Sequence, residues 1–113
     1  YGDGGERDFT HVEDIARGVV AAIEPMGYEI INLGGDDPTR ISKVISIIEK
    51  TLGKTASVER MPRHAADVDS TWADIGKAAR LLGWRPEISL ERGLEGAVEW
   101  YLEQREWAKD ISA

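Results

Sequence analysis

The chain has 113 residues, 42% hydrophobic and 31% charged, which is the composition of an ordinary soluble globular protein and limits it to one small domain or part of a larger one. Its formal charge of -7, from 21 acidic and 14 basic residues, excludes the extended basic face that non-specific nucleic-acid or anionic-membrane binding requires. The sequence contains no cysteine, which excludes disulfides and thiolate zinc sites, and its apolar runs fall far short of the roughly 18 residues of a membrane span.

The first predicted elements are a helix and a strand. After a glycine-rich opening, apolar side chains in residues 12–23 recur at the spacing of one helix face, and Pro25 and Gly27 end that helix. Residues 28–33 are β-branched and mostly apolar, which predicts a strand. Because its apolar residues are consecutive, this strand is typical of a parallel sheet covered on both faces. Either its partner strands lie outside this chain, or the chain's own helices cover a small sheet.

A second helix follows a turn. The turn at residues 34–38 is rich in glycine and aspartate, and residues 41–52 again place apolar side chains on one helix face. Asp37 or Thr39 is the predicted N-terminal cap of this helix. Gly53 suits its C-terminal end, because glycine adopts the left-handed backbone conformation found there.

The second half of the chain predicts one more strand and two more helices. Residues 56–61 indicate the strand, and residues 62–71 are a polar loop without a clear period. Asp74 caps a short helix that Gly83 ends, and Ser89 caps the final helix. The order of elements predicts an α/β chain, mostly helices with two or three short strands.

Several stretches carry a family resemblance in their order and spacing. They are YGDGGERDFTHVED at residues 1–14, YEIINLG at 28–34, MPRHAADV at 61–68 with TWAD at 71–74, and LGWRPEISLERGL at 82–94. Together they resemble the C-terminal part of the extended short-chain dehydrogenase/reductase family, in particular its nucleotide-sugar epimerases and dehydratases. Each stretch alone is a weak signal, whereas together they cover nearly the whole chain.

This resemblance implies the fold and the cofactor. Residues 1–113 would form a single C-terminal, nucleotide-sugar-binding fragment of an extended Rossmann-type enzyme, with the Rossmann NAD-binding domain missing upstream. NAD would be the cofactor of the full-length enzyme, in which hydride moves between sugar and NAD while a Tyr-x-x-x-Lys pair and a Ser or Thr handle the proton. This sequence contains neither that pair nor the glycine fingerprint of dinucleotide binding. We therefore expect no catalytic residue, no bound cofactor and no activity in this chain alone.

The specific activity stays open between alternatives. Residues 61–68 are most similar to UDP-hexuronate and UDP-hexose 4-epimerases, which indicates a fragment of a UDP-sugar 4-epimerase. The nearer rival is a nucleotide-sugar 4,6-dehydratase fragment. A hypothesis of another class is a stand-alone, non-catalytic binding or dimerisation module that reuses this fold.

Four residues are the predicted substrate-binding set. Arg7 stands where the family has an arginine that contacts the diphosphate, and its planar fork of donors matches phosphate oxygens. Asp67 matches the aspartate that binds ribose. The position three residues before it, often Arg or Gln facing the phosphates, is His64 with Arg63 beside it, so either of these two residues is a candidate. The alternatives are a surface arginine paired with a neighbouring carboxylate and a solvated polar loop.

The expected partners follow from the family resemblance and from the pattern of the predicted strand at residues 28–33. In the family, upstream residues also hold the base and the sugar, so UDP-sugar binding by this chain should be weak or absent. An unpaired apolar strand at residues 28–33 favours a homodimer through that region. No nucleic acid, membrane or metal partner is expected, and the cytoplasm is the expected location. Asp14 should stabilise the N-terminus of its helix rather than touch a ligand.

Overall fold

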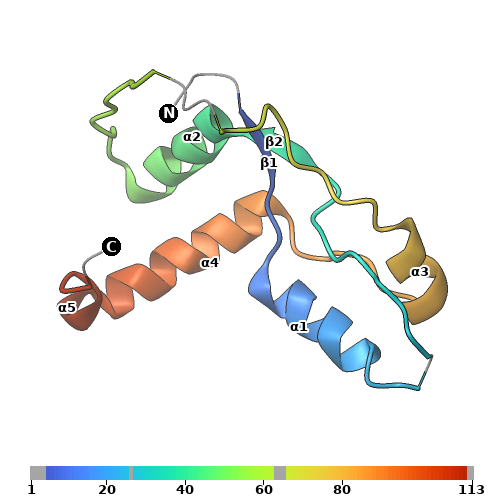
Figure 1. The fold of residues 1–113 in the computed structure, drawn as a ribbon. Coiled ribbons are helices and arrows are strands. Elements are labelled where there is room, and N and C mark those ends of the chain that lie inside the picture. Colours follow the sequence, from blue (N-terminus) through green and yellow to red (C-terminus); the bar gives the residue numbers. More distant parts are fainter. Residues whose placement is uncertain (1–4, 26, 63–65, 112–113) are drawn as a thin grey trace.

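The computed structural model describes residues 5–25, 27–62 and 66–111 as a mixed α/β chain (Figure 1). Its sheet pairs β1 (Glu6–Asp8) with β2 (Pro38–Arg40) in antiparallel register, with Arg7 opposite Thr39. The helices are α1 (Val12–Ala21), α2 (Ile41–Leu52), α3 (Gly76–Leu82), α4 (Leu90–Glu103) and α5 (Arg105–Ala108). Among the helices described, none is long and apolar enough to cross a membrane. The predicted fold class, mostly helical with a few short strands, is confirmed.

The helices end where local chemistry predicts. Gly53 and Gly83 take positive φ angles of 62° and 60° at the C-terminal ends of α2 and α3, a conformation that favours glycine. The Ser89 side chain accepts a hydrogen bond from the backbone N–H of Arg92 and so caps α4. The prediction for the start of α2 is wrong, because Arg40 occupies that cap position without a side-chain hydrogen bond.

The predicted strands are wrong in position. Residues 28–33 run extended, but no described strand pairs with them, and residues 56–61 form an exposed irregular segment. The observed strands, β1 and β2, lie instead beside the predicted turns. A strand is defined by its hydrogen-bonded neighbour, so an apolar, β-branched segment without a neighbour remains an unpaired extended segment.

The small core lies between α1, α3 and the extended segment 28–33. Ile75, Ala78 and Trp84 are its buried apolar residues, and Ile31 and Leu33 pack against them. On the other side of the molecule α2 packs against α4 (Figure 1). Trp84, which lies in the connector between α3 and α4, is only 3% exposed in this core.

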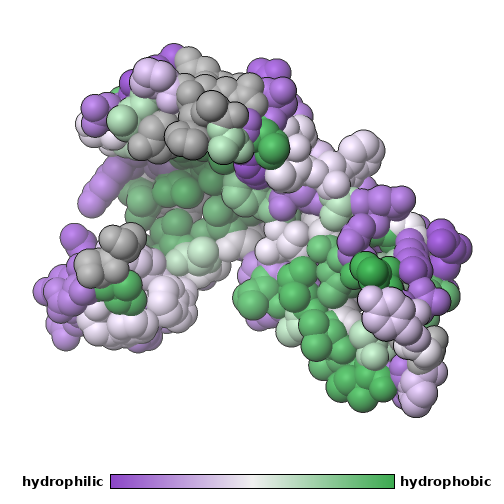
Figure 2. Space-filling view, in the orientation of Figure 1, coloured by the Kyte–Doolittle hydropathy of each residue, from purple (hydrophilic) through white to green (hydrophobic). Residues whose placement is uncertain are grey.

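The chain is more open than a self-contained domain of its size. Its exposed surface is 8711 Å², against about 6,200 Å² expected for a folded monomer of 12.5 kDa. The radius of gyration is 16.7 Å, whereas a compact domain of this length measures about 13 Å. Apolar residues gather on the exposed side of α1, among them Val19, Val20 and Ile23 (Figure 2). Much of this surface therefore has the character of an interface.

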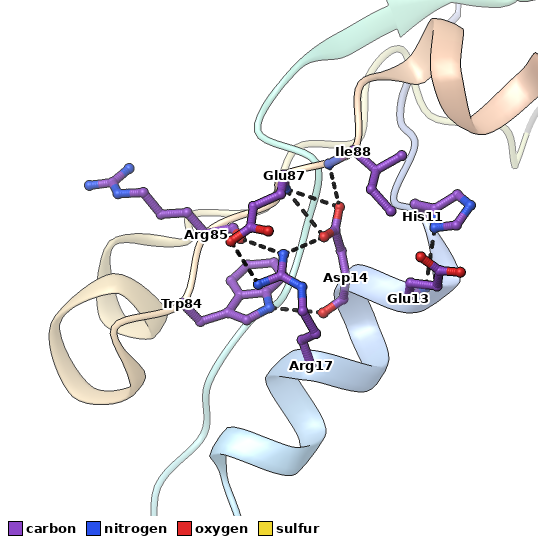
Figure 3. Close-up of polar contacts among 8 residues, drawn as sticks. All are labelled: His11, Glu13, Asp14, Arg17, Trp84, Arg85, Glu87 and Ile88. Atoms are coloured by element: carbon purple, nitrogen blue, oxygen red, sulfur yellow. Dashed lines mark hydrogen bonds and ion pairs between the residues drawn. The ribbon is translucent and has the colours of Figure 1, made fainter.

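The buried carboxylate of Asp14 joins the two halves of the chain (Figure 3). It accepts hydrogen bonds from the backbone N–H groups of Glu87 at 3.2 Å and Ile88 at 3.0 Å, and it forms an ion pair with Arg17. The indole N–H of Trp84 donates to the Asp14 carbonyl at 2.8 Å. Asp14 thus has a structural role, as predicted, but its partners are in the connector before α4 rather than at the start of α1.

The electrostatics of Asp14 favour its charged form. Burial alone would raise its pKa, but the hydrogen bond from Arg17, those from the backbone of Ile88 and Glu87, and the positive charge of Arg17 together lower the pKa below its ordinary value. A carboxyl group with a lowered pKa in the folded state stabilises the fold above its unfolded-state pKa. That stabilisation is lost as the pH falls through the folded-state pKa.

Replacing Asp14 by Asn should therefore destabilise the fold by about 2–3 kcal/mol at neutral pH, because the amide places a donor against the backbone N–H groups or Arg17 and removes the charge that Arg17 pairs with. The difference in stability between wild type and Asp14→Asn should narrow as the pH falls from the unfolded-state pKa, about 4, through the lowered folded-state pKa of Asp14, below which the wild-type carboxyl is also neutral. Urea unfolding of both proteins at a series of pH values measures this difference in the free energy of unfolding. Asp110→Asn, at an exposed aspartate, is the matched control. A difference that does not change with pH would contradict the assigned role.

Candidate functional site

The candidate site is built on β1, which lies between two neighbours. One edge of β1 pairs with β2, and the other contacts the segment 66–71 (Figure 1). There the backbone N–H of Glu6 donates to the Asp69 carbonyl at 2.9 Å, and the Thr71 N–H donates to the Glu6 carbonyl at 3.1 Å. This pairing brings β1 beside residues more than half the chain away in sequence.

Arg7 faces this segment with its guanidinium. Its Nη1 donates to the carbonyl oxygens of Glu6 at 2.8 Å and Val68 at 3.1 Å, and its Nη2 forms an ion pair with the Asp67 carboxylate. The side chains of Arg7 and Asp67 are 27% and 30% exposed, so the pair is mostly buried but accessible from one side. The Arg7 guanidinium is therefore fixed by protein contacts while part of its side chain remains accessible to solvent.

The structure brings two of the four predicted binding residues into contact. Arg7 and Asp67 form one ion pair, although they were selected separately from the sequence. Arg63 and His64 lie outside the described residues, so their orientation toward phosphate stays a prediction. Within the described part of the chain, no group of His, Asp and Glu side chains could hold a metal ion.

Sequence analysis missed Asp8, which fixes the strand that carries Arg7. Its Oδ2 accepts a hydrogen bond from the Ala73 backbone at 3.0 Å, and its own N–H donates to Thr71 Oγ1 at 3.2 Å. Its buried Oδ1 has no hydrogen-bond partner among the described residues. The signal was present in the R-D-F motif, because alternate residues of a strand face opposite sides and Asp8 must therefore face away from Arg7.

The adjacent glycines at 34 and 35 accommodate the Asp8 carboxylate. A Cβ atom on Gly34 would lie 2.7 Å from Asp8 Oδ2, and one on Gly35 would lie 2.6 Å from Asp8 Oδ1 and 2.2 Å from the Phe9 carbonyl. A carboxylate so close to this loop repels an anion, so these glycines do not suit the pyrophosphate of a dinucleotide. The loop at residues 34–35 is therefore a packing feature and does not fit the pyrophosphate of NAD.

Comparison with known proteins covers nearly the whole chain. The sequence profile of the family described as GDP-mannose 4,6 dehydratase matches residues 1–97. UDP-glucuronate 4-epimerase of Thermodesulfobacterium geofontis is 52% identical over 113 residues, which is 98% of this chain and 35% of that protein.

Solved structures agree with this similarity. UDP-glucuronic acid 4-epimerase from Bacillus cereus, in complex with UDP-glucuronic acid and NAD, is 39% identical with a TM-score of 0.84, over 92% of this chain and 34% of that one. UDP-glucose 4-epimerase from Thermotoga maritima, with UDP-glucose, is 30% identical with a TM-score of 0.86, over 93% of this chain and 34% of that one. The chain thus spans about a third of the length of the relatives it matches.

Gly35→Ala should destabilise the fold by roughly 1–3 kcal/mol, because the new methyl group would overlap the Phe9 carbonyl and the Asp8 carboxylate. The matched control is Gly96→Ala in α4, where a Cβ would meet no atom within 4 Å and alanine improves helix propensity by about 1 kcal/mol. Chemical denaturation of both variants gives the comparison. Equal stability of the two would refute the close packing of Asp8 on Gly35.

Proposed function

This chain belongs to the GDP-mannose 4,6-dehydratase family of nucleotide-sugar enzymes, as its sequence motifs indicated, and we propose that it supplies diphosphate contacts in an NAD-dependent nucleotide-sugar 4-epimerase. The observation that carries this proposal is the anchored Arg7 guanidinium. It is fixed by Asp67 and Val68, yet its side chain is 27% exposed. Planar, charged donors in a fixed orientation suit phosphate oxygens, which accept strong charge-assisted hydrogen bonds.

The proposed substrate class is a UDP-sugar, either a UDP-hexuronate or a UDP-hexose. Its support is similarity to proteins described as UDP-glucuronate and UDP-glucose 4-epimerases. A 4,6-dehydratase is the second candidate, because the matching family profile carries a dehydratase's name and a diphosphate contact serves both reactions.

We propose that this chain contributes to substrate binding in the enzyme and supplies none of the catalytic residues. The sequence contains no Tyr-x-x-x-Lys pair, and the glycines at 34 and 35 do not suit a dinucleotide. NAD and the proton-transfer groups would therefore be held by residues outside this chain in the intact enzyme. With UDP-sugar and NAD added, the chain alone is expected to be inactive and to bind the nucleotide weakly or not at all.

Arg7→Ala should weaken UDP binding by roughly tenfold or more, because it removes a charge-assisted contact to phosphate. Arg7→Lys should fall between wild type and alanine, since lysine keeps the charge but loses the planar fork. NMR titration with UDP measures these constants, because chemical-shift changes remain quantifiable for weak complexes.

Arg92→Ala is the matched control, since it also removes one positive charge but at an exposed position of α4. Its affinity for UDP should equal that of wild type. Identical titrations of wild type and Arg7→Ala would refute the proposed diphosphate contact.

We also propose that the chain alone forms a homodimer through residues 28–33. The backbone of this extended segment pairs with no described strand, and Ile30 is 69% exposed within it. Unpaired strand-like backbone with apolar side chains is a template for a second copy, and a twofold dimer closes such a contact. The large open surface of the chain supports the same proposal.

Sedimentation velocity of the wild-type chain should therefore show a dimer, and Ile30→Lys should shift it to monomer by placing a charge in the contact. Val58→Lys is the control, because Val58 is 56% exposed but lies in the irregular segment after α2. A wild-type monomer whose amides at residues 28–33 are protected from exchange would show that the chain covers this segment itself.

A further inference from the structure

The contact between Arg7 and Asp67 joins two segments that are 60 residues apart in sequence. Both side chains are more than two-thirds buried, unlike the many surface ion pairs that fluctuate freely. The backbone on either side is also tied, because β1 and the segment 66–71 share hydrogen bonds. The carboxylate of Asp67 therefore acts on a guanidinium whose strand is already fixed.

The hydrogen bonds of Arg7 can be counted donor by donor. A guanidinium has five N–H donors. Both donors on Nη1 are used by the carbonyls of Glu6 and Val68, and one donor on Nη2 is used by Asp67. The N–H on Nε and the second N–H on Nη2 have no acceptor among the described residues. In a guanidinium the Nε–H bond points the same way as one N–H bond of Nη2, so these two nitrogens form one edge that can serve two oxygens of one ligand.

We propose that Asp67 is a positioning residue for diphosphate binding, which fixes the Arg7 guanidinium so that its Nε and Nη2 donors face the ligand. This inference rests on the proposed function of Arg7. Arginine loses much rotamer freedom when it binds a ligand, and a side chain fixed beforehand has less freedom to lose. The carbonyls of Glu6 and Val68 hold Nη1, whereas Asp67 is the side chain that holds Nη2.

The carboxylate of Asp67 also has a second, opposing effect, because its negative charge repels a phosphate. Asp67→Asn and Asp67→Ala separate the two effects. Both variants remove the charge, but only Asn keeps a side-chain oxygen that accepts a hydrogen bond from Nη2. For inorganic pyrophosphate, which has no ribose, any difference in affinity between these two variants therefore reports the positioning of Arg7, and neither the charge at residue 67 nor a ribose contact.

The test is an NMR titration of the 113-residue chain with inorganic pyrophosphate and with UDP. Asp67→Ala should bind both roughly threefold to tenfold more weakly than Asp67→Asn, which is the range expected for fixing one long side chain. Asp67→Asn should bind at least as tightly as wild type, because it loses repulsion and keeps the acceptor. Equal affinities of the Asn and Ala variants, or tighter binding by Ala, would overturn the inference.

A ligand-free measurement gives an independent answer. The Nε–H signal of Arg7 should be separate from those of exposed arginines such as Arg92, both in wild type and in Asp67→Asn. In Asp67→Ala it should move to the position of the exposed arginines. A wild-type signal that already coincides with Arg92 would overturn the inference, even if the alanine variant failed to fold.

The outcomes also separate the two proposals. If Arg7→Ala leaves anion binding unchanged, the proposed function of Arg7 is wrong. If Arg7→Ala weakens binding while the Asn and Ala variants of Asp67 behave alike, only the positioning role is wrong, and Arg7 binds the diphosphate without help from Asp67.

Discussion

The arrangement of the whole chain depends on the buried carboxylate of Asp14. It links α1, in the first third of the sequence, to the connector that begins α4, across 73 and 74 residues of chain. Each hydrogen bond to a buried charge contributes about 1.5–3 kcal/mol, so this link is strong for a molecule with so small a core. Since α4 packs on α2, and α2 directly follows β2, the link reaches the sheet as well. The strand that carries Arg7 is therefore fixed in two ways. It is continuous with α1, which follows it in the chain, and it is hydrogen-bonded to β2 along one edge.

The helices could be predicted because their signals are local. A helix satisfies its own backbone, and its ends depend on residues within one turn, as with Gly53, Gly83 and Ser89. Asp37 and Thr39 show the limit of this reasoning. Both have side chains that often cap helices, but the pairing of β2 with β1 moved the helix start past them. A tertiary contact thus overrode a local preference.

The strands could not be predicted, because the partner of a strand is set by the rest of the fold. Residues 28–33 have strong strand character but no described partner, whereas Glu6–Asp8 has little strand character and gains neighbours on both edges. The candidate site likewise combines residues that sequence motifs identify with contacts that only the fold determines. The family motifs identified Arg7 and Asp67 one by one, but nothing in the sequence indicated that they form an ion pair. Asp8 was missed because its role depends on its fit against Gly35, which is distant in sequence.

The charge of the chain limits how tightly its candidate site can hold an anion. With a net charge of -7 the chain repels anions at long range, but salt screens charges beyond about 8 Å, so the groups near Arg7 decide its affinity. Those groups are acidic: Asp67 pairs with Arg7, and Glu6 lies beside it in β1, although Arg40 partly offsets Glu6 at 3.5 Å. Arg7 together with Asp67 thus offers phosphate-binding donors in a fixed orientation but little net positive charge. A diphosphate carries at least two negative charges, so tight binding needs further cations. Arg63 is one candidate within this chain, and the open surface provides room for others from a covering partner.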